Sequence, residues 1–343
     1  MAMTWIKRLF VLALLAILFY LFLPVARELK DLGSVVREAS LPWLLAAVAI
    51  QFISYTSLTW LNKLLLRPFP GKIGFWHMMA VLPAIAFIEV TVPSMGASGV
   101  ILRVRLLGRS GYSAESSTFT VAMEGLFIGV MMFAVSLLGL AYMLRTGEVR
   151  QFQLVLLGMV VLLLVVLSAL AIWFGRDRRQ VARLLLGLNA ATNRWRAKFN
   201  RPLADGSAIV PKVDQFYKGL EQMGRLPVYP YFLAAFIRVS LDIATLGACF
   251  IAFHYIIPLG VLLTGYGLML LVSGLSAIPG GLGIAELSLS VIYARLGAPG
   301  AVAVAAALTY RLIAWWLVRF AGFISWQVLE VRYAKKRTDS PAV

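Results

Sequence analysis

Charged side chains interrupt several long apolar stretches of this sequence, and their chemistry needs an explanation. They are Glu89, Arg103, Arg105, Glu124, Arg238, Asp242, Glu286, Arg311 and Arg319. A charge inside a membrane span costs about 2.5–3.5 kcal/mol on insertion scales. Such a residue therefore pairs with an opposite charge or lines a path for a polar substrate.

Two of these residues have the spacing of an ion pair within one helix. Arg238 and Asp242 are four residues apart, which places them on the same helix face. We expect them to form a structural ion pair. Glu89 and Arg103 flank Pro93, four residues before it and ten after it. They either pair or lie at different depths.

Glu286 and Arg311 allow two interpretations. Glu286 follows a glycine-rich turn, and Arg311 lies in the middle of the next apolar stretch. They either form a buried pair, or Arg311 binds a phosphate group that Glu286 positions. A guanidinium group suits phosphate because its planar fork donates two parallel hydrogen bonds. Arg103 and Glu124 occupy loosely corresponding places earlier in the chain, so these four are the candidate substrate-binding residues.

No residue pattern indicates a metal or a cofactor, and we predict neither. Cys249 is the single cysteine, and the two histidines, His77 and His254, are far apart in the sequence. The sequence has no phosphate-binding loop and no Ser/His/Asp set that can be placed in one site. We therefore assign no catalytic residue.

The composition is that of a membrane protein. Of the 343 residues, 61% are hydrophobic and 14% are charged, against about 45–50% and 25% in soluble domains. Apolar runs this long span membranes as helices, because lipid offers the backbone no hydrogen-bond partner. We predict an all-α, polytopic integral membrane protein. The net charge of +17 lies mainly at helix ends and in one loop, which favours anionic lipid headgroups as partners over nucleic acid.

The apolar runs predict about eight transmembrane helices and two shorter, glycine-rich pieces. The helices are expected at 6–26, 41–66, 73–92, 115–144, 151–174, 229–254, 258–277 and 299–329, and the shorter pieces at 94–109 and 280–296. The first run is longer than the apolar part of a signal peptide, so we interpret it as a retained helix. The polar stretch 175–227 is basic, and Arg178 to Phe199 alternates basic and apolar residues, as helices on membrane surfaces do.

Basic residues orient these helices, because they are enriched on the cytoplasmic side. Lys7 and Arg8 place the N-terminus in the cytoplasm, and the basic stretch 175–227 and the C-terminal tail belong there as well. We therefore predict a multi-pass protein of the inner (cytoplasmic) membrane with both termini in the cytoplasm. It follows that 73–109 is a hairpin entered from the cytoplasm and 258–296 one entered from outside. The sequence leaves open whether each hairpin crosses fully or turns near the midplane.

The two hairpins share a pattern, which predicts an internal repeat. The predicted turns contain Pro93, Gly96 and Gly99 in the first hairpin and Pro279, Gly280, Gly281 and Gly283 in the second. Gly111 and Gly297 each follow the turn proline by 18 residues. We interpret 1–145 and 146–335 as two membrane repeats of opposite orientation. Inverted repeats with paired Gly/Pro-broken segments are typical of transporters, whereas single glycines also serve tight helix packing.

The second hairpin carries a motif that resembles a known family. The stretch from Ile278 to Glu286 (IPGGLGIAE), with Gly297 and Arg311 after it, is similar to the C-terminal signature of the lysylphosphatidylglycerol synthase transmembrane family. This is the flippase region of the multiple peptide resistance factor and its stand-alone relatives. The Pro93–Gly111 stretch resembles the first-half motif of the family, without its acidic residue before the arginine. The resemblance implies a lipid flippase or another lipid-handling role.

The resemblance does not imply lysyl transfer. In the family that activity belongs to a separate soluble domain, and this chain ends at Val343, just after the last predicted helix. Our first hypothesis is a transporter that moves a lipid with a polar or phosphate headgroup. The second is an integral membrane transferase or an accessory subunit in glycolipid synthesis, which turnover of a lipid donor would reveal. A third is a scaffold, which would tolerate apolar replacements of the charges.

Overall fold

The computed structural model describes residues 32–92, 97–146, 178–197, 205–207, 209–275 and 283–338, and every regular element in these ranges is a helix. The helices are α2 (Leu32–Arg37), α3 (Leu41–Leu66), α4 (Phe75–Thr91), α5 (Ala97–Gly108), α6 (Ala114–Thr146), α8 (Arg178–Ala197), α9 (Ile209–Gly224), α10 (Tyr229–Ala252), α11 (Leu259–Leu275), α12 (Ile284–Arg295), α13 (Gly300–Arg311), the π-helical η3 (Leu312–Leu317) and α14 (Val318–Thr338). The predicted all-α fold is confirmed.

Most predicted boundaries are close to the observed ones. The run 41–66 is matched to the residue by α3, and the piece 94–109 becomes α5. Four of the described helices are long and apolar enough to cross a membrane, namely Leu41–Leu66, Ala114–Gly139, Tyr229–Ala252 and Gly300–Val331. The predicted helices at 6–26 and 151–174 lie outside the described residues, so the total of about eight spans stays a prediction.

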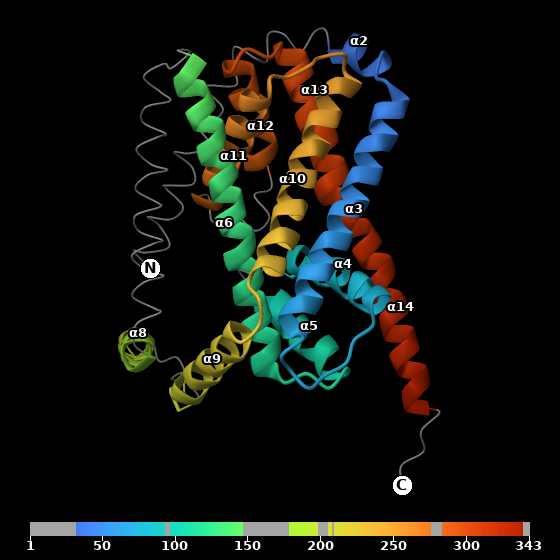
Figure 1. Cartoon of the computed structure of the whole chain (residues 1–343). Helices are drawn as coiled ribbons and strands as arrows, with labels where there is room; N and C mark the ends of the chain where they lie inside the picture. The colour runs from blue at the N-terminus through green and yellow to red at the C-terminus, as the bar shows by residue number, and fades with distance from the viewer. Residues whose placement is uncertain are drawn as a thin grey trace.

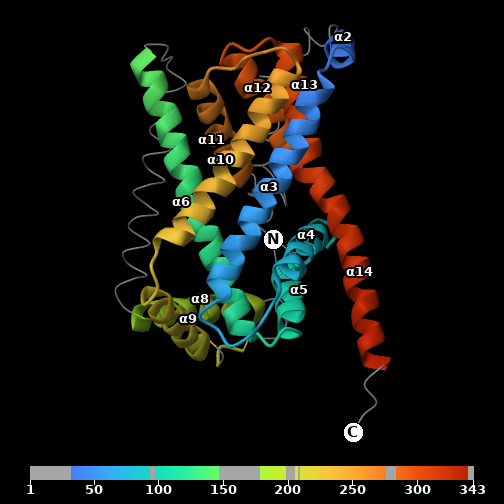
Figure 2. The same cartoon turned by 45° about the vertical axis from the view of Figure 1, so that its right-hand side comes forward.

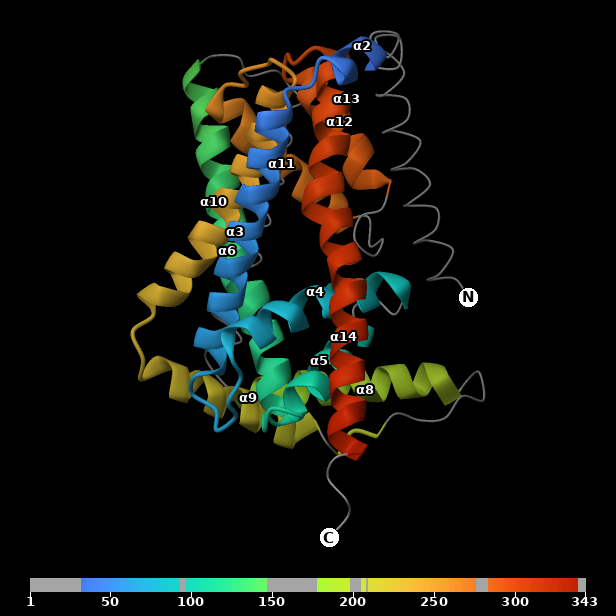
Figure 3. The same cartoon turned by 90° about the vertical axis from the view of Figure 1, so that its right-hand side faces the viewer.

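The long helices form an upright bundle, and two pairs of shorter helices fill opposite ends of it (Figures 1 and 3). α3, α6, α10 and the continuous α13–η3–α14 rod run the height of the bundle (Figure 1). In every view, α4 and α5 lie in its lower half and α11 and α12 in its upper half (Figure 2). The polar stretch 175–227 contains α8 and α9, which lie at the lower end of the bundle, on the side of α6 and away from α14 (Figures 1 and 2).

The second arm of each hairpin ends in the same way. Gly111 follows α5 with a φ of 83°, and Gly297 follows α12 with a φ of 100°. Each glycine donates its N–H to the carbonyl three residues earlier, and the next residue donates to the carbonyl five residues earlier. This is the Schellman motif, whose left-handed residue is usually glycine because a Cβ is unfavourable there. It explains why a glycine follows the second arm of each hairpin.

Close backbone contacts hold the shorter helices against the long ones. A Cβ at Gly139 of α6 would overlap the backbone of α11 at Thr264, and one at Gly267 of α11 would overlap Ser136 of α6. A Cβ at Gly322 of α14 would overlap the carbonyl group of Pro83 in α4. In membranes, where apolar association between helices gives little driving force, small residues of this kind allow van der Waals packing.

We expect Gly322→Ala to destabilise the protein by about 1–3 kcal/mol, because the backbone of α4 must move to admit the methyl group. Gly129→Ala is the matched control: that glycine also lies within a long helix, but a Cβ there meets nothing within 4 Å. Helix propensity alone would make both changes stabilising by up to about 1 kcal/mol. Thermal unfolding of the purified variants in detergent measures the difference. Equal melting temperatures would show that α4 and α14 do not pack this closely.

Candidate functional site

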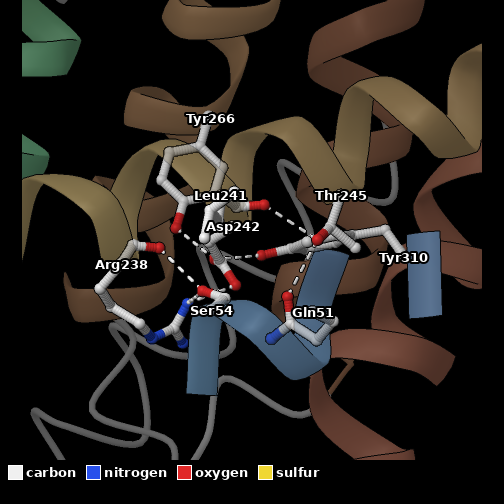
Figure 4. Close-up of polar contacts among 8 residues, drawn as sticks. All are labelled: Gln51, Ser54, Arg238, Leu241, Asp242, Thr245, Tyr266 and Tyr310. Atoms are coloured by element: carbon white, nitrogen blue, oxygen red, sulfur yellow. Dashed lines mark hydrogen bonds and ion pairs between the residues drawn. The ribbon is translucent and has the colours of Figure 1, made fainter. Parts of the chain in front are cut away.

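A buried polar network surrounds the ion pair of α10 (Figure 4). Arg238 and Asp242 form a salt bridge of 2.8 Å, as their spacing predicts. The Arg238 guanidinium also donates to the Ser54 hydroxyl of α3 at 2.7 Å, and Ser54 donates to the Arg238 carbonyl at 2.9 Å. One turn further along, Thr245 donates to the Gln51 side chain at 3.0 Å. Polar contacts therefore join α10 to α3 in the middle of the bundle.

Two tyrosines complete this network, and the sequence did not identify them. Tyr266 of α11 and Tyr310 of α13 both donate hydrogen bonds to Oδ2 of Asp242, at 2.6 and 2.8 Å. The carboxylate thus receives donors from three helices, and Asp242 is only 5% exposed. Charge-assisted hydrogen bonds of this kind offset the cost of removing the pair from water. The arrangement is that of a structural crosslink.

We expect Tyr266→Phe and Tyr310→Phe each to destabilise the protein by about 1–3 kcal/mol, because each removes one hydrogen bond to a charged group. The helix melting temperature in detergent, followed by circular dichroism, measures this loss. Tyr142→Phe is the control, because Tyr142 of α6 is 45% exposed. A Tyr266→Phe protein as stable as the control would contradict the buried network.

The first pair of candidate substrate-binding residues is brought together. Arg103 of α5 forms a 2.8 Å salt bridge with Glu124 of α6. Its guanidinium also donates to the side-chain carbonyl of Asn62 in α3. The Arg103 side chain is 6% exposed and that of Glu124 is 19% exposed. This ion pair therefore links the second arm of the lower helix pair to the long helix that follows it.

The second pair has the same connectivity with the charges exchanged. Glu286 of α12 and Arg311 of α13 form a 2.8 Å salt bridge through Arg311 Nε. The other carboxylate oxygen, Oε2 of Glu286, is buried without a hydrogen-bond partner among the described residues. The second arm of the upper helix pair is again linked to the long helix that follows it.

An aromatic side chain lies beside the second ion pair. The Trp315 ring of η3 has the Arg311 guanidinium 4.9 Å from its centroid and the Arg319 guanidinium 4.2 Å from it. π-Helical turns are rare and are often found at functional sites. The sequence identified Arg319 as an intramembrane charge but gave no sign of the π-helical turn.

The remaining predicted residues are placed as follows. Glu89 of α4 lies against Gly99 of α5, because a Cβ at Gly99 would overlap its carboxylate. No salt bridge joins Glu89 to Arg103 in the described residues, so the first alternative, an ion pair between them, is not observed. Gly283 precedes α12 with a φ of 77°. The other predicted turn residues, Pro93, Gly96, Pro279, Gly280 and Gly281, lie outside the described residues.

In the described part of the chain, no group of three or more His, Cys, Asp or Glu side chains is arranged to hold a metal ion. The polar groups that do gather are arginine–carboxylate pairs with tyrosine and tryptophan partners. In this structure these groups pair with one another, through the salt bridges Arg103–Glu124, Arg238–Asp242 and Arg311–Glu286. The candidate site therefore consists of ion pairs and hydrogen bonds between side chains of different helices.

Comparison with known proteins agrees with this picture of a helical membrane protein. The family model described as the lysylphosphatidylglycerol synthase TM region matches residues 8–322. A relative named a UPF0104 membrane protein, from Methanothermobacter thermautotrophicus, is 24% identical over 297 residues, which cover 85% of this chain and 87% of the relative. The family points to a membrane protein of lipid metabolism or lipid transport. This chain belongs to the lysylphosphatidylglycerol synthase transmembrane-region family.

Proposed function

We propose that the protein is a lipid transporter that moves a lipid with a polar or phosphate headgroup across the cytoplasmic membrane. The carrying observation is the pair of matched ion pairs, Arg103–Glu124 and Glu286–Arg311, each at 2.8 Å. Each pair joins the second arm of a helical hairpin to the following long helix, and the two hairpins lie at opposite ends of the bundle (Figure 1). Buried charges at membrane depth are typical of substrate pathways.

The lengths of the hairpin arms support two related halves, 1–145 and 146–335. α4 has 17 residues and α12 has 12, and the described parts of their counterparts α11 and α5 also have 17 and 12 residues. Both second arms end in a glycine with positive φ, Gly111 and Gly297. Two similar units inserted from opposite sides give two states of similar energy, one open to each side of the membrane. This is the property that alternating access requires.

The hairpins are proposed to be re-entrant. A helix of 12 residues rises only about 18 Å, whereas the hydrocarbon core of a bilayer is about 30 Å thick. The 12 residues of α12, and the 12 described residues of α5, are therefore too few to cross it alone. Backbone that turns at membrane depth is tolerated where it faces protein or a polar pathway. The headgroup would pass this region while the acyl chains stay in the bilayer.

The orientation follows from charge. α8 carries Arg178, Arg179, Arg183, Arg194 and Arg196, and it lies at the same end of the bundle as α9 and the end of α14. The positive-inside rule assigns that end to the cytoplasm. α8 also exposes apolar side chains, among them Leu188 and Trp195. Basic and apolar groups together suit a helix that rests on anionic lipid at the cytoplasmic surface.

The test is a transport measurement with purified protein in liposomes. The vesicles contain a phosphatidylglycerol labelled on its acyl chain with a fluorophore that dithionite reduces. Dithionite does not cross the membrane, so transport is seen as loss of the fluorescence that protein-free vesicles protect. We expect the protein to bring the labelled lipid of the inner leaflet to the outer leaflet, where dithionite reduces it, with or without an imposed proton gradient. Protection equal to that of empty vesicles, for every headgroup tried, would refute the proposal, and consumption of the lipid would favour the transferase.

A further inference from the structure

Arg319 differs from the other arginines in the interior of the bundle. Within the described residues, Arg103, Arg238 and Arg311 each have a carboxylate oxygen at 2.8 Å, whereas no carboxylate lies within 4 Å of Arg319. Its guanidinium stacks on Trp315 and donates to the Trp315 carbonyl at 3.1 Å. Its Nε is buried without a hydrogen-bond partner. A formal positive charge is thus held by an indole ring and a backbone carbonyl.

The position of Arg319 within an apolar span makes a positive charge without a contacting anion energetically unfavourable. The residue lies near the middle of the Gly300–Val331 span. The ionisable groups around it are Tyr55, Glu89, Arg238 and Arg311. The two arginines repel it, and Glu89, the carboxylate among the four, attracts it from beyond the 4 Å of an ion pair. A desolvated cation beside like charges gains from an anion in direct contact. Within the described residues no carboxylate makes that contact, so an external anion would complete the site.

Arg311 and Arg319 present two guanidinium groups to one aromatic ring. Each lies four residues from Trp315, and residues four apart are neighbours on a helix surface. Both guanidinium groups therefore contact the Trp315 ring, at 4.9 and 4.2 Å from its centroid. The planar fork of arginine matches the oxygens of a phosphate group. The stacked indole fixes the orientation of both forks.

We propose that Arg319, stacked on Trp315 beside Arg311, binds the phosphate group of the transported lipid, which would be the anion in direct contact that no described carboxylate supplies. This rests on the proposed transport function and extends it to a substrate class, lipids with an anionic phosphate headgroup. Glu286 competes with the phosphate for Arg311, so binding and release exchange one ion pair for another.

The experiment measures binding and not transport, so that failure of this site and failure of the proposed function are distinguishable. Delipidated protein in neutral detergent is titrated with dioleoylphosphatidylglycerol, and bound lipid is counted by native mass spectrometry. Dioleoylglycerol, which lacks the phosphate, and inorganic phosphate are the two comparison ligands. The variants are Arg319→Gln, Arg319→Lys, and Arg67→Gln as a control at an exposed basic residue that follows α3.

We expect Arg319→Gln to weaken phosphatidylglycerol binding by at least about tenfold, the effect of losing one charged hydrogen bond. Arg319→Lys should restore part of the affinity, and Arg67→Gln should leave it unchanged. Because Arg319→Gln removes a charge that has no carboxylate partner, its melting temperature without lipid should equal or exceed that of the original protein. A loss of binding with retained stability separates a ligand site from a structural role.

Three results would overturn the proposal in whole or in part. Equal affinity of Arg319→Gln and the original protein for phosphatidylglycerol would show that the phosphate lies elsewhere. Equal affinity for dioleoylglycerol would show that the phosphate is not recognised. If inorganic phosphate displaced phosphatidylglycerol at the same concentration at which the lipid saturates the site, the site would recognise free phosphate and not a lipid. A dependence of that phosphate binding on Arg319 would still support an oxyanion site there.

Discussion

Vesicles that contain the Arg311→Ala variant are expected to show no lipid transport above protein-free vesicles. Among the contacts of Arg311 that the substitution removes are the salt bridge to Glu286 at 2.8 Å and the contact with the Trp315 ring at 4.9 Å. A pathway that exchanges ion pairs cannot operate with a single unpaired carboxylate, because that carboxylate repels an anionic headgroup. The dithionite protection assay measures the effect.

The controls separate transport from folding. Arg311→Ala leaves the Glu286 carboxylate buried alone, which by itself lowers stability. The double variant Glu286→Gln with Arg311→Gln removes both charges and keeps groups that can hydrogen-bond each other, so it should fold and still fail to transport. Arg295→Ala is the matched control, because Arg295 lies on the same helix α12 but is exposed. Full transport by the double variant would exclude this ion pair from the pathway.

The sequence predicts those features that depend on local patterns. The run 41–66 begins beside Ser40 and Pro42 and ends near Lys63, so its length and end signals define α3 to the residue. The Arg238–Asp242 pair follows from a spacing of four. In both cases the information lies within one helix. Nothing outside that helix is needed to make the prediction.

Features that depend on contacts between helices were not visible in the sequence. Tyr266 and Tyr310 lie in apolar runs and look like core aromatic residues, yet both hydroxyls reach Asp242 on another helix. Asn62 likewise meets Arg103 only after α3 and α5 pack together.

The largest loss of stability is expected for Asp242→Ala. This carboxylate accepts hydrogen bonds from Arg238, Tyr266 and Tyr310, between 2.6 and 2.8 Å. Its removal leaves a buried guanidinium without a counterion and two buried hydroxyls without acceptors. Breaking one side of a buried ion pair costs about 3–5 kcal/mol, which is a large part of the stability of an ordinary domain. We expect a strong fall in melting temperature and in the yield of monodisperse protein.

A second substitution tests whether the cost comes from the uncompensated charge. Arg238→Met combined with Asp242→Leu replaces the ion pair by apolar side chains of similar size, which is often neutral in protein interiors. The double variant should therefore recover most of the lost stability, although Ser54 and the two tyrosines lose partners. Asp214→Ala is the control, because the salt bridge of that exposed residue to Arg178 is 3.9 Å long, and exposed pairs contribute about 0–1 kcal/mol. If Asp242→Ala melted together with Asp214→Ala, Asp242 would be solvated, and the helices around it would be held together by their apolar surfaces alone.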